Sequence, residues 1–575
     1  MRKRVFKSLS ILLLTPLFFC ECSQAQEEAS TGIFEYREIY LPEGVFEVEK
    51  LGLNSVDNDW GIWGHHLDKV LPKNHSMTVY AQVNGQRVRD QFCFSSEQLF
   101  GYIENYIDEH YSKSGTHRFA ILPNDNALVC QCELCQGLGN TSKNASPAVF
   151  HLIKRLAERF PEHIFFTSYY QTTKGLPDEI LPANTGVLVS AMDFPLSPIT
   201  TPAEYDFEAL LKSWHEKISR VYVWDYVNNF DDYFTPYPIL DVMQHRIRLY
   251  ERCGVNGIFL NGSGTEYSTL SRIKTYVLAD LLKNPHADMK ELILKYCHEF
   301  YPVTGDEIAS YIFLFEATTS KKEKPLPMYQ GVDYVMKSYF LPEEFSPFHM
   351  RLLELLPQTT GLEKDELSLM CQAFAMTRLE IKRINNHIHN GTAELLDLLW
   401  SMIDTGVVSY SETFWSTRHY VREYREMIQH DKQYGSKNLL KGKKLVALTP
   451  LDEDYNDISI LTDGQLGLPH NYHCGQMISS ANPALRIGIP HVDGMKKLRV
   501  SFTVNAIFKI ALPLRVQLTA GGKTIGTIVP KASSANPNRS AIEFDIPSSA
   551  TGDLVLTVVR NPEVKTMALD EIEGF

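Results

Sequence analysis

The stretch RVYVWDYVNNFDDYFTPYPILDVMQHRIRLYERCGVNGIFLNGSG, residues 220–264, contains one complete strand–helix–strand unit. The runs 220–227 and 257–264 are short and rich in β-branched and aromatic residues, so both predict buried strands. The segment 239–252 between them has the apolar spacing of a helix. A strand that returns through a helix to a second strand of the same kind favours a parallel pair.

The same alternation continues towards the N-terminus. Six further strand-like runs precede this unit, at 33–41, 48–55, 91–96, 118–125, 164–170 and 186–193, and the other helical segments are 97–112, 147–160, 203–218 and 270–283. Eight strands that alternate with helices predict an α/β fold, a (β/α)8 TIM-like barrel over residues 26–285. The first two strand–helix units are irregular.

The pattern changes twice after the barrel. Residues 286–436 have helical spacing, as in KDELSLMCQAFAMTRLEIKRINNHIHN at 364–390, and predict a helical domain. Residues 437–575 contain short alternating runs separated by Gly, Pro, Asn and Ser, which predict a C-terminal antiparallel β-sandwich.

Composition excludes several classes of protein. The 575 residues are 44% apolar and 22% charged, which is typical of a globular chain and excludes a mostly disordered or fibrous one. The formal net charge of −13 argues against nucleic acid as a partner, because phosphate binding requires a basic surface.

The N-terminus predicts export. Arg2, Lys3, Arg4 and Lys7 precede the short apolar run 9–19, so residues 1–25 resemble a signal peptide. Ser23-Gln24-Ala25 fits ordinary cleavage, and lipid attachment at Cys20 is the alternative. Either route predicts a periplasmic or cell-surface protein. We expect no transmembrane segment, because no other stretch has the roughly 18 apolar residues that one requires.

In such a barrel the active site lies at the carboxyl ends of the strands. Hydrolysis of a glycosidic bond requires two carboxyl groups, and sugar rings stack on flat aromatic side chains. The predicted strand ends supply Asp125, Asp225 and Glu266 as catalytic candidates. The candidates for substrate binding are His65, His66, Trp63, Asn124, Tyr169, Tyr170, Trp224, Tyr226 and Asn261.

Each catalytic candidate also has a structural interpretation. Asp125 follows a strand and is in a position to cap the next helix. Asp225 lies within an apolar run, as a buried hydrogen-bonded carboxylate would. Glu266 precedes a helix, where a negative charge favours the helix dipole. His65 and His66 are also compatible with ordinary loop residues.

Four cysteines are expected near this site. Cys130, Cys132 and Cys135 lie in the loop after the predicted fourth strand, and Cys93 ends the third. Three states are compatible with them, namely a tetrahedral structural zinc, disulfides formed after export, or free thiols. In each case the cluster would brace the loop that carries Asp125.

Other catalytic motifs are missing from the sequence. It contains no phosphate-binding glycine loop, no Gly-x-Ser-x-Gly and no His-Glu-x-x-His. Kinases, α/β-hydrolases and zincin proteases are therefore excluded, and we expect no cofactor to be required.

Several of these motifs, taken in order, resemble a known family. The runs FEYREIYL, WGIWGHH, FCFSS, LPNDN with CQCELC, VYVWDYVNNFDDYFTPYPIL and GVNGIFLNGSGTEYSTLSRIKTYVLADLLKNP are similar to the bacterial domain of unknown function 4838 family over roughly residues 34–315. That resemblance implies an exported protein with a glycosidase-like barrel, similar in fold to α-glucuronidases and family 20 hexosaminidases. By the same analogy Asp125 would be the acid, with Asp225 or Glu266 as the base.

The C-terminal runs ILTDGQLG and MALDEIEG are similar to galactose-binding-like sandwich modules. The sequence therefore leads to two hypotheses. The chain is a glycoside hydrolase acting on a complex glycan or polysaccharide, or it is a non-catalytic glycan-binding protein with a degenerate barrel.

Overall fold

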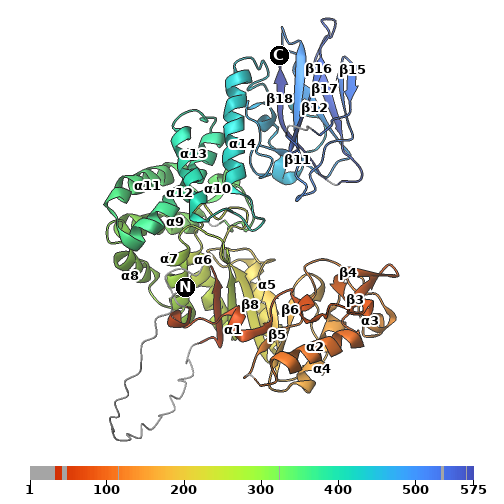
Figure 1. Cartoon of the computed structure of the whole chain (residues 1–575), viewed down its shortest axis with the longest axis vertical. Coiled ribbons are helices and arrows are strands. Elements are labelled where there is room, and N and C mark those ends of the chain that lie inside the picture. The colour runs from red at the N-terminus through yellow and green to blue at the C-terminus, as the bar shows by residue number, and fades with distance from the viewer. Residues whose placement is uncertain (1–32, 42–47, 114, 323, 533–535, 565) are drawn as a thin grey trace, which may run out of the picture.

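The computed structural model describes residues 33–41, 48–113, 115–322, 324–532, 536–564 and 566–575. The predicted signal peptide and Cys20 lie outside the described residues. Figure 1 shows an elongated molecule in which a helical part separates the central parallel sheet from a β-sandwich. In the described part of the chain, no helix combines the length and the apolar character needed to cross a membrane.

The central sheet is parallel throughout and has seven strands among the described residues, in the order β1-β9-β8-β7-β6-β5-β2. Among the described residues β1 and β2 each pair on one side only, so this sheet forms a curled half-barrel, and the predicted eight-stranded closed barrel is not confirmed. Its strands are β1 (Tyr36–Tyr40), β2 (Trp60–Ile62), β5 (Arg118–Ala120), β6 (Ile164–Tyr169), β7 (Thr185–Ser190), β8 (Arg220–Tyr226) and β9 (Gly257–Asn261).

Two predicted barrel strands were wrong. In the run 48–55 the structure has a 3-10 turn, Val48–Leu51, and no strand. The run 91–96 begins at the end of β4 (Gln86–Phe92), which pairs antiparallel with β3 (Tyr80–Val83) outside the central sheet. Asn84 and Gly85 join β3 to β4 with positive φ angles of 50° and 80°, as a tight hairpin turn requires.

Helices follow the strands and pack against them through apolar faces. In α2, Leu99, Ile103 and Ile107 recur at a spacing of four residues and are fully buried. The helices of this region are α1 (Val56–Asp59), α2 (Glu97–His110), α3 (Glu133–Gly137), α4 (Ser146–Arg159), α5 (Pro202–His215), α6 (Leu240–Arg252) and α7 (Ser271–Lys283). Figure 1 shows the β3–β4 hairpin grouped with α2, α3 and α4 to one side of the sheet.

Aromatic side chains fill the inside of the half-barrel. Tyr36, Trp60, Phe166, Tyr222 and Phe259 form one buried cluster. Successive side chains of a strand point to opposite faces, so the residues at every second position continue along the inside towards the carboxyl ends. Those ends are where the candidate site lies.

The helical part packs around one long helix, α12, which contacts α10, α11 and α13. Its helices are α8 (Met289–Phe300), α9 (Gly305–Lys322), α10 (Val332–Ser338), α11 (Pro342–Leu355), α12 (Gly361–Ile384), α13 (Thr392–Ser401) and α14 (Thr417–His430).

Two antiparallel sheets follow, and apolar residues from both form one core. The five-stranded sheet has the order β10-β12-β17-β14-β15 and the four-stranded sheet the order β11-β18-β13-β16. Their strands are β10 (Val446–Ala447), β11 (Met477–Ser479), β12 (Ala484–Ile489), β13 (Lys497–Thr503), β14 (Arg515–Ala520), β15 (Lys523–Ile528), β16 (Arg539–Asp545), β17 (Leu554–Val559) and β18 (Met567–Gly574).

Candidate functional site

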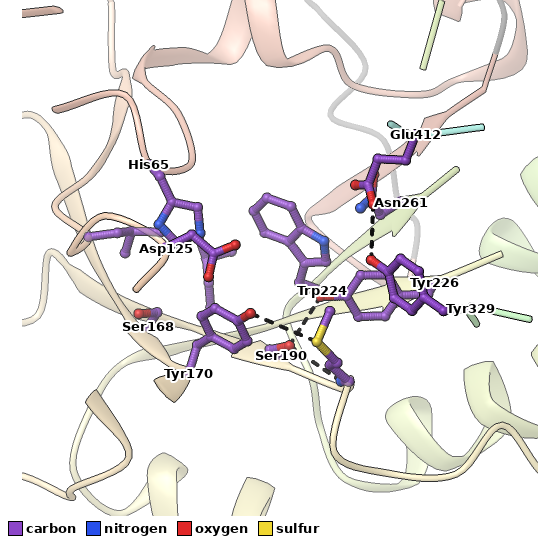
Figure 2. Close-up of a pocket in the computed structure, with 13 residues that line it drawn as sticks. His65, Asp125, Ser168, Tyr170, Ser190, Trp224, Tyr226, Asn261, Tyr329 and Glu412 are labelled. Atoms are coloured by element: carbon purple, nitrogen blue, oxygen red, sulfur yellow. Dashed lines mark hydrogen bonds between the residues drawn. The ribbon is translucent and has the colours of Figure 1, made fainter. Parts of the chain in front are cut away.

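A cavity of about 190 Å³ opens at the carboxyl ends of the parallel strands. Figure 2 shows its polar and aromatic lining. The lining residues are His65, Leu122, Asp125, Ser168, Tyr170, Leu188, Ser190, Met192, Trp224, Tyr226, Asn261, Tyr329 and Glu412. Most of these come from every second position of β6, β7, β8 and β9 or their extensions, which is the inward face of the sheet.

Two carboxyl groups line this cavity. Asp125 comes from the loop after β5, and Glu412 comes from the loop before α14 in the helical part. Figure 2 shows them on either side of the pocket, with the Trp224 ring between them in that view. The site therefore combines groups from two parts of the chain that are almost 300 residues apart.

Glu412 is held in place by its own backbone and by a tyrosine. Its N–H donates to Phe230 O at 2.8 Å, and the Tyr329 hydroxyl donates to its Oε2 at 3.1 Å. The residue is exposed overall, yet loss of hydration at the carboxyl raises the pKa of Glu412 above its ordinary value. The negative charges of Asp231 and Asp125 raise that pKa further, and the Tyr329 hydrogen bond opposes the rise.

Asp125 is oriented by the chain around it. The Gln171 side-chain amide donates to Asp125 Oδ1 at 2.6 Å. The preceding residue is clamped by the hairpin, because Asn124 N donates to Gln91 Oε1 at 3.0 Å and Gln91 Nε2 donates to Asn124 O at 3.1 Å. Asn124 is thus a residue that fixes the loop, and it does not line the cavity.

Aromatic rings form the floor and walls. The Trp224 ring stacks on Trp63, with centroids 4.9 Å apart and planes at 9°, and meets Phe259 edge to face. Trp63 therefore supports Trp224 from behind and is not a lining residue. The Tyr226 hydroxyl lies 3.2 Å from Ser190 Oγ, and Tyr170 faces the same space.

His65 brings a ring nitrogen to the pocket. Its Nδ1 lies 2.6 Å from Pro123 O. A carbonyl oxygen only accepts, so Nδ1 carries the hydrogen and Nε2 is the acceptor in the neutral ring. Nε2 can therefore accept a hydrogen bond from a substrate hydroxyl.

Among the residues predicted from the sequence, six line the cavity, namely His65, Asp125, Tyr170, Trp224, Tyr226 and Asn261. Six do not, namely Asp225, Glu266, His66, Trp63, Asn124 and Tyr169. His66 is exposed beside the pocket, and Tyr169 points to the opposite face of β6 from Tyr170.

Asp225 is a structural carboxylate. It is fully buried on the outer face of β8, where Arg246 Nη1 donates to its Oδ2 at 3.0 Å and the Tyr250 hydroxyl donates to the same oxygen. Arg246 also donates to Phe194 O and Pro195 O at 2.8 Å. The prediction that Asp225 faces the substrate was wrong, because Trp224 and Tyr226 occupy the inward positions on either side of it.

Glu266 does not reach the cavity either. Its N–H closes a turn with Ser263 O at 3.0 Å ahead of α7. The second carboxyl of the pocket is Glu412, which the sequence reasoning missed together with Tyr329. Both lie in irregular segments of the helical part, and no strand-end pattern marks them.

The four cysteines converge beside the Asp125 loop. Cys93, Cys130, Cys132 and Cys135 are buried, and their sulfur atoms all lie within 4.8 Å of one another. The eight cysteines of the described residues are all free of disulfide bonds.

Residues 34–313 match the model of the family described as Domain of unknown function (DUF4838). None of the curated proteins matches the sequence.

Several solved structures are similar to the chain at low identity. One is a family GH115 4-O-methyl-alpha-glucuronidase with specificity for decorated arabinogalactans, at 10% identity and a TM-score of 0.39, covering 95% of this chain and 82% of that one. A Thermobaculum terrenum O-GlcNAc hydrolase mutant is 12% identical with a TM-score of 0.35, covering 71% and 98%. A GH138 enzyme targeting pectin rhamnogalacturonan II is 9% identical with a TM-score of 0.28, covering 95% and 86%.

Proposed function

We propose that this chain, which carries the domain of the DUF4838 family over residues 34–313, is an exported glycoside hydrolase acting on a complex glycan. The observation that carries the proposal is the pair of carboxyl groups, Asp125 and Glu412, which line one aromatic pocket at the carboxyl ends of the parallel strands. The predicted signal segment and the acidic composition support an enzyme that acts outside the cytoplasm.

The surroundings of the two carboxyls suggest different roles. A general acid has to be protonated before it gives its proton to the leaving oxygen, and the raised pKa of Glu412 favours that form. Asp125, oriented by Gln171, then acts from the other side as the base that activates water or as the nucleophile. This assignment moves the acid from Asp125, where family analogy would place it, to Glu412.

The remaining lining suits a sugar. Trp224, Tyr170 and Tyr226 offer flat faces to the C–H groups of a pyranose ring, and His65 Nε2 and Asn261 offer polar atoms to its hydroxyls. The C-terminal sandwich, resembling galactose-binding modules, would hold the enzyme to its polysaccharide.

The proposal is tested by incubating the purified chain with a panel of plant and host polysaccharides and measuring released sugars by chromatography. At least one glycan should yield sugar in amounts that grow with enzyme and time. Saturable binding with no released sugar across the panel would favour the alternative, a non-catalytic glycan-binding protein.

A further inference from the structure

We propose that Cys93, Cys130, Cys132 and Cys135 bind one zinc ion, and that this ion fixes the loop that carries Asp125. The four thiols come from two separate segments: Cys93 directly follows β4, Cys130 and Cys132 precede α3, and Cys135 lies within α3. All four are buried, with Cys135 completely inaccessible.

The distances between the sulfur atoms are those of a metal site. Cys93 Sγ lies 3.7 Å from Cys132 Sγ and 3.8 Å from Cys135 Sγ. Four thiolates about 2.3 Å from a zinc ion at the corners of a tetrahedron are about 3.8 Å apart. A disulfide would require roughly 2.05 Å.

The neighbours of the sulfurs are donors that a thiolate cluster needs. The Gln82 backbone N–H donates to Cys130 Sγ at 3.2 Å, and the Ser95 hydroxyl lies 3.0 Å from Cys135 Sγ. The Arg87 guanidinium lies beside Cys93. Zinc with four thiolates carries a net charge of −2, which the positive charge of Arg87 and the two neutral donors offset in part.

The cluster and the active-site loop share a segment of chain. Gln91, two residues before Cys93, holds Asn124 through both of its side-chain polar atoms, and it also donates to Asn126 Oδ1 at 3.2 Å. At the other end of the loop, Gln131 N donates to Gln82 O at 2.8 Å. A metal that joins Cys93 to Cys130 and Cys132 therefore fastens both ends of the loop in which Asp125 lies.

The direct test is the metal content of the purified full chain, measured by plasma mass spectrometry after dialysis. We expect one zinc per chain. Cys132→Ser and Cys135→Ser should retain less than a tenth of it. Cys253→Ser, which changes a buried thiol in a different core cluster, should retain all of it.

A second readout does not depend on the variants folding. Replacing the metal of the wild-type chain with Co²⁺ should produce the visible absorption of tetrahedral thiolate coordination, and removing it should speed proteolysis within residues 124–135. A wild-type chain that binds neither Zn²⁺ nor added Co²⁺ under reducing conditions would overturn the proposal. So would intact-mass evidence that these four cysteines are isolated as two disulfides.

Discussion

The carboxyl of Glu412 accepts a hydrogen bond from Tyr329 and lies within the electrostatic reach of Asp125 and Asp231. Desolvation and these charges keep its pKa raised, and the Tyr329 hydroxyl opposes them by stabilising the charged form. If Glu412 is the general acid, hydrolysis falls as the pH rises through its pKa, because the proton to be donated is lost.

Tyr329→Phe is therefore expected to move the alkaline limb of the pH–rate profile to higher pH, since the pKa of Glu412 rises when the hydrogen bond is removed. The measurement is kcat/KM against pH for both proteins on the same glycan. An alkaline limb that stays in place, or moves to lower pH, would contradict the role given to Glu412.

Glu38 is another carboxyl group with a raised pKa, and it is buried inside the half-barrel. Its Oε1 accepts from Val56 N at 2.9 Å, and the Tyr36 hydroxyl donates to Oε2, yet burial still raises the pKa of Glu38 to about 7. The folded protein thus binds a proton between about pH 4.5 and 7 that the unfolded chain releases, so the free energy of unfolding falls as the pH rises through this window.

The share of Glu38 in that fall is roughly 3 kcal/mol at 1.36 kcal/mol per pKa unit. Glu38→Gln is expected to flatten the decline in the unfolding midpoint between about pH 4.5 and 7, measured by urea titration at several pH values. An equally steep decline in the variant would show that other buried acids, such as Glu316, account for all of it.

The alternation of side chains between the two faces of β8 explains which pocket residues could be predicted from the sequence. The strand-end pattern predicts Trp224, Asp225 and Tyr226 at the pocket, although adjacent side chains of a strand point to opposite faces. The structure keeps Trp224 and Tyr226 inside and buries Asp225 against Arg246. Strict use of the two-residue period would have removed Asp225, and likewise Tyr169, from the candidates.

At the scale of the elements, a carboxylate of α12 accepts hydrogen bonds from the residues just before α9. Glu363 Oε1 accepts from Val303 N at 3.0 Å, Thr304 N at 2.9 Å and the Thr304 hydroxyl at 2.9 Å. Glu363 is 3% exposed, so its removal leaves three donors, two of them on the fully buried Thr304, without this acceptor.

We expect Glu363→Ala to lower the stability of the helical part by about 3 kcal/mol, measured by denaturant unfolding followed by circular dichroism. Glu363→Gln keeps an oxygen acceptor in the same position and serves as the matched control, with less than half of that loss. Equal losses in the two variants would mean that these hydrogen bonds do not stabilise the junction.

The strand pattern predicted β6, β7, β8 and β9 well, because each is a compact apolar run between turn residues. It failed at the start of the sheet for identifiable reasons. β2 has only three residues, which is too short for a strand pattern to stand out. β4 pairs with β3 in a hairpin, and its Asn84-Gly85 turn is the dipeptide that favours such a hairpin. With β2 added and the runs 48–55 and 91–96 removed, the eight predicted strands become the seven parallel strands of the described residues.

Over the whole molecule, the pocket depends on contacts between distant parts of the chain. Phe230, after β8, donates to Met328 O at 2.7 Å and accepts from Glu412 N, which brings Tyr329 and Glu412 over the sheet. No periodicity in residues 286–436 encodes that packing, so Asp125 could be nominated from the sequence and Glu412 could not.

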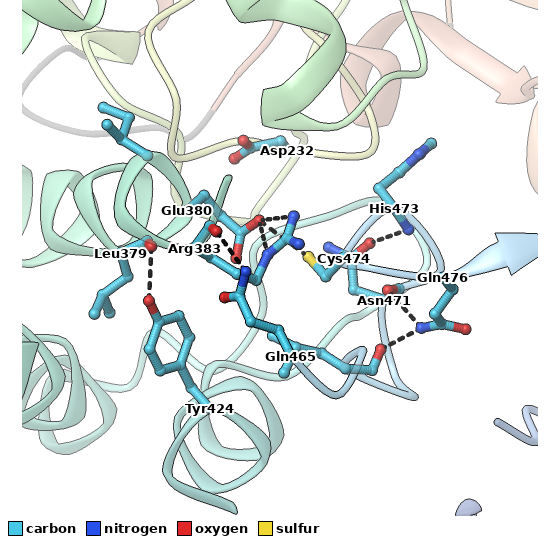
Figure 3. A network of polar contacts seen from close by, with 12 residues as sticks. Asp232, Leu379, Glu380, Arg383, Tyr424, Gln465, Asn471, His473, Cys474 and Gln476 are labelled. Carbon is cyan, nitrogen blue, oxygen red and sulfur yellow. Dashed lines mark hydrogen bonds and ion pairs between the residues drawn. The ribbon is translucent and has the colours of Figure 1, made fainter. Parts of the chain in front are cut away.

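The sandwich is joined to the helices by a buried polar network (Figure 3). Glu380 of α12 accepts from Arg383 Nε at 2.9 Å, from the Tyr420 hydroxyl at 2.7 Å and from Cys474 Sγ at 3.4 Å. Gln465, between β10 and β11, donates to Arg383 O at 2.9 Å. The Arg383 charge is therefore balanced inside the junction.

Glu380→Gln is expected to cost about 3 kcal/mol, because it leaves the buried Arg383 charge without its partner. In calorimetry the melting temperature should fall, with the sandwich transition separating from that of the helical part. The double variant Glu380→Gln/Arg383→Gln should recover part of the loss, and a double variant as unstable as the sum of both single changes would refute the coupling.

The central claim is that Asp125 and Glu412 together cleave a glycosidic bond. It is tested most directly by the rate of sugar release from one glycan by the wild type, Asp125→Asn, Glu412→Gln and the control Glu266→Gln, with glycan binding measured in parallel. We expect kcat to fall at least about a hundredfold in each of the first two variants, with binding retained, and to stay near the wild-type value in the control. Wild-type rates in Asp125→Asn and Glu412→Gln would contradict the account.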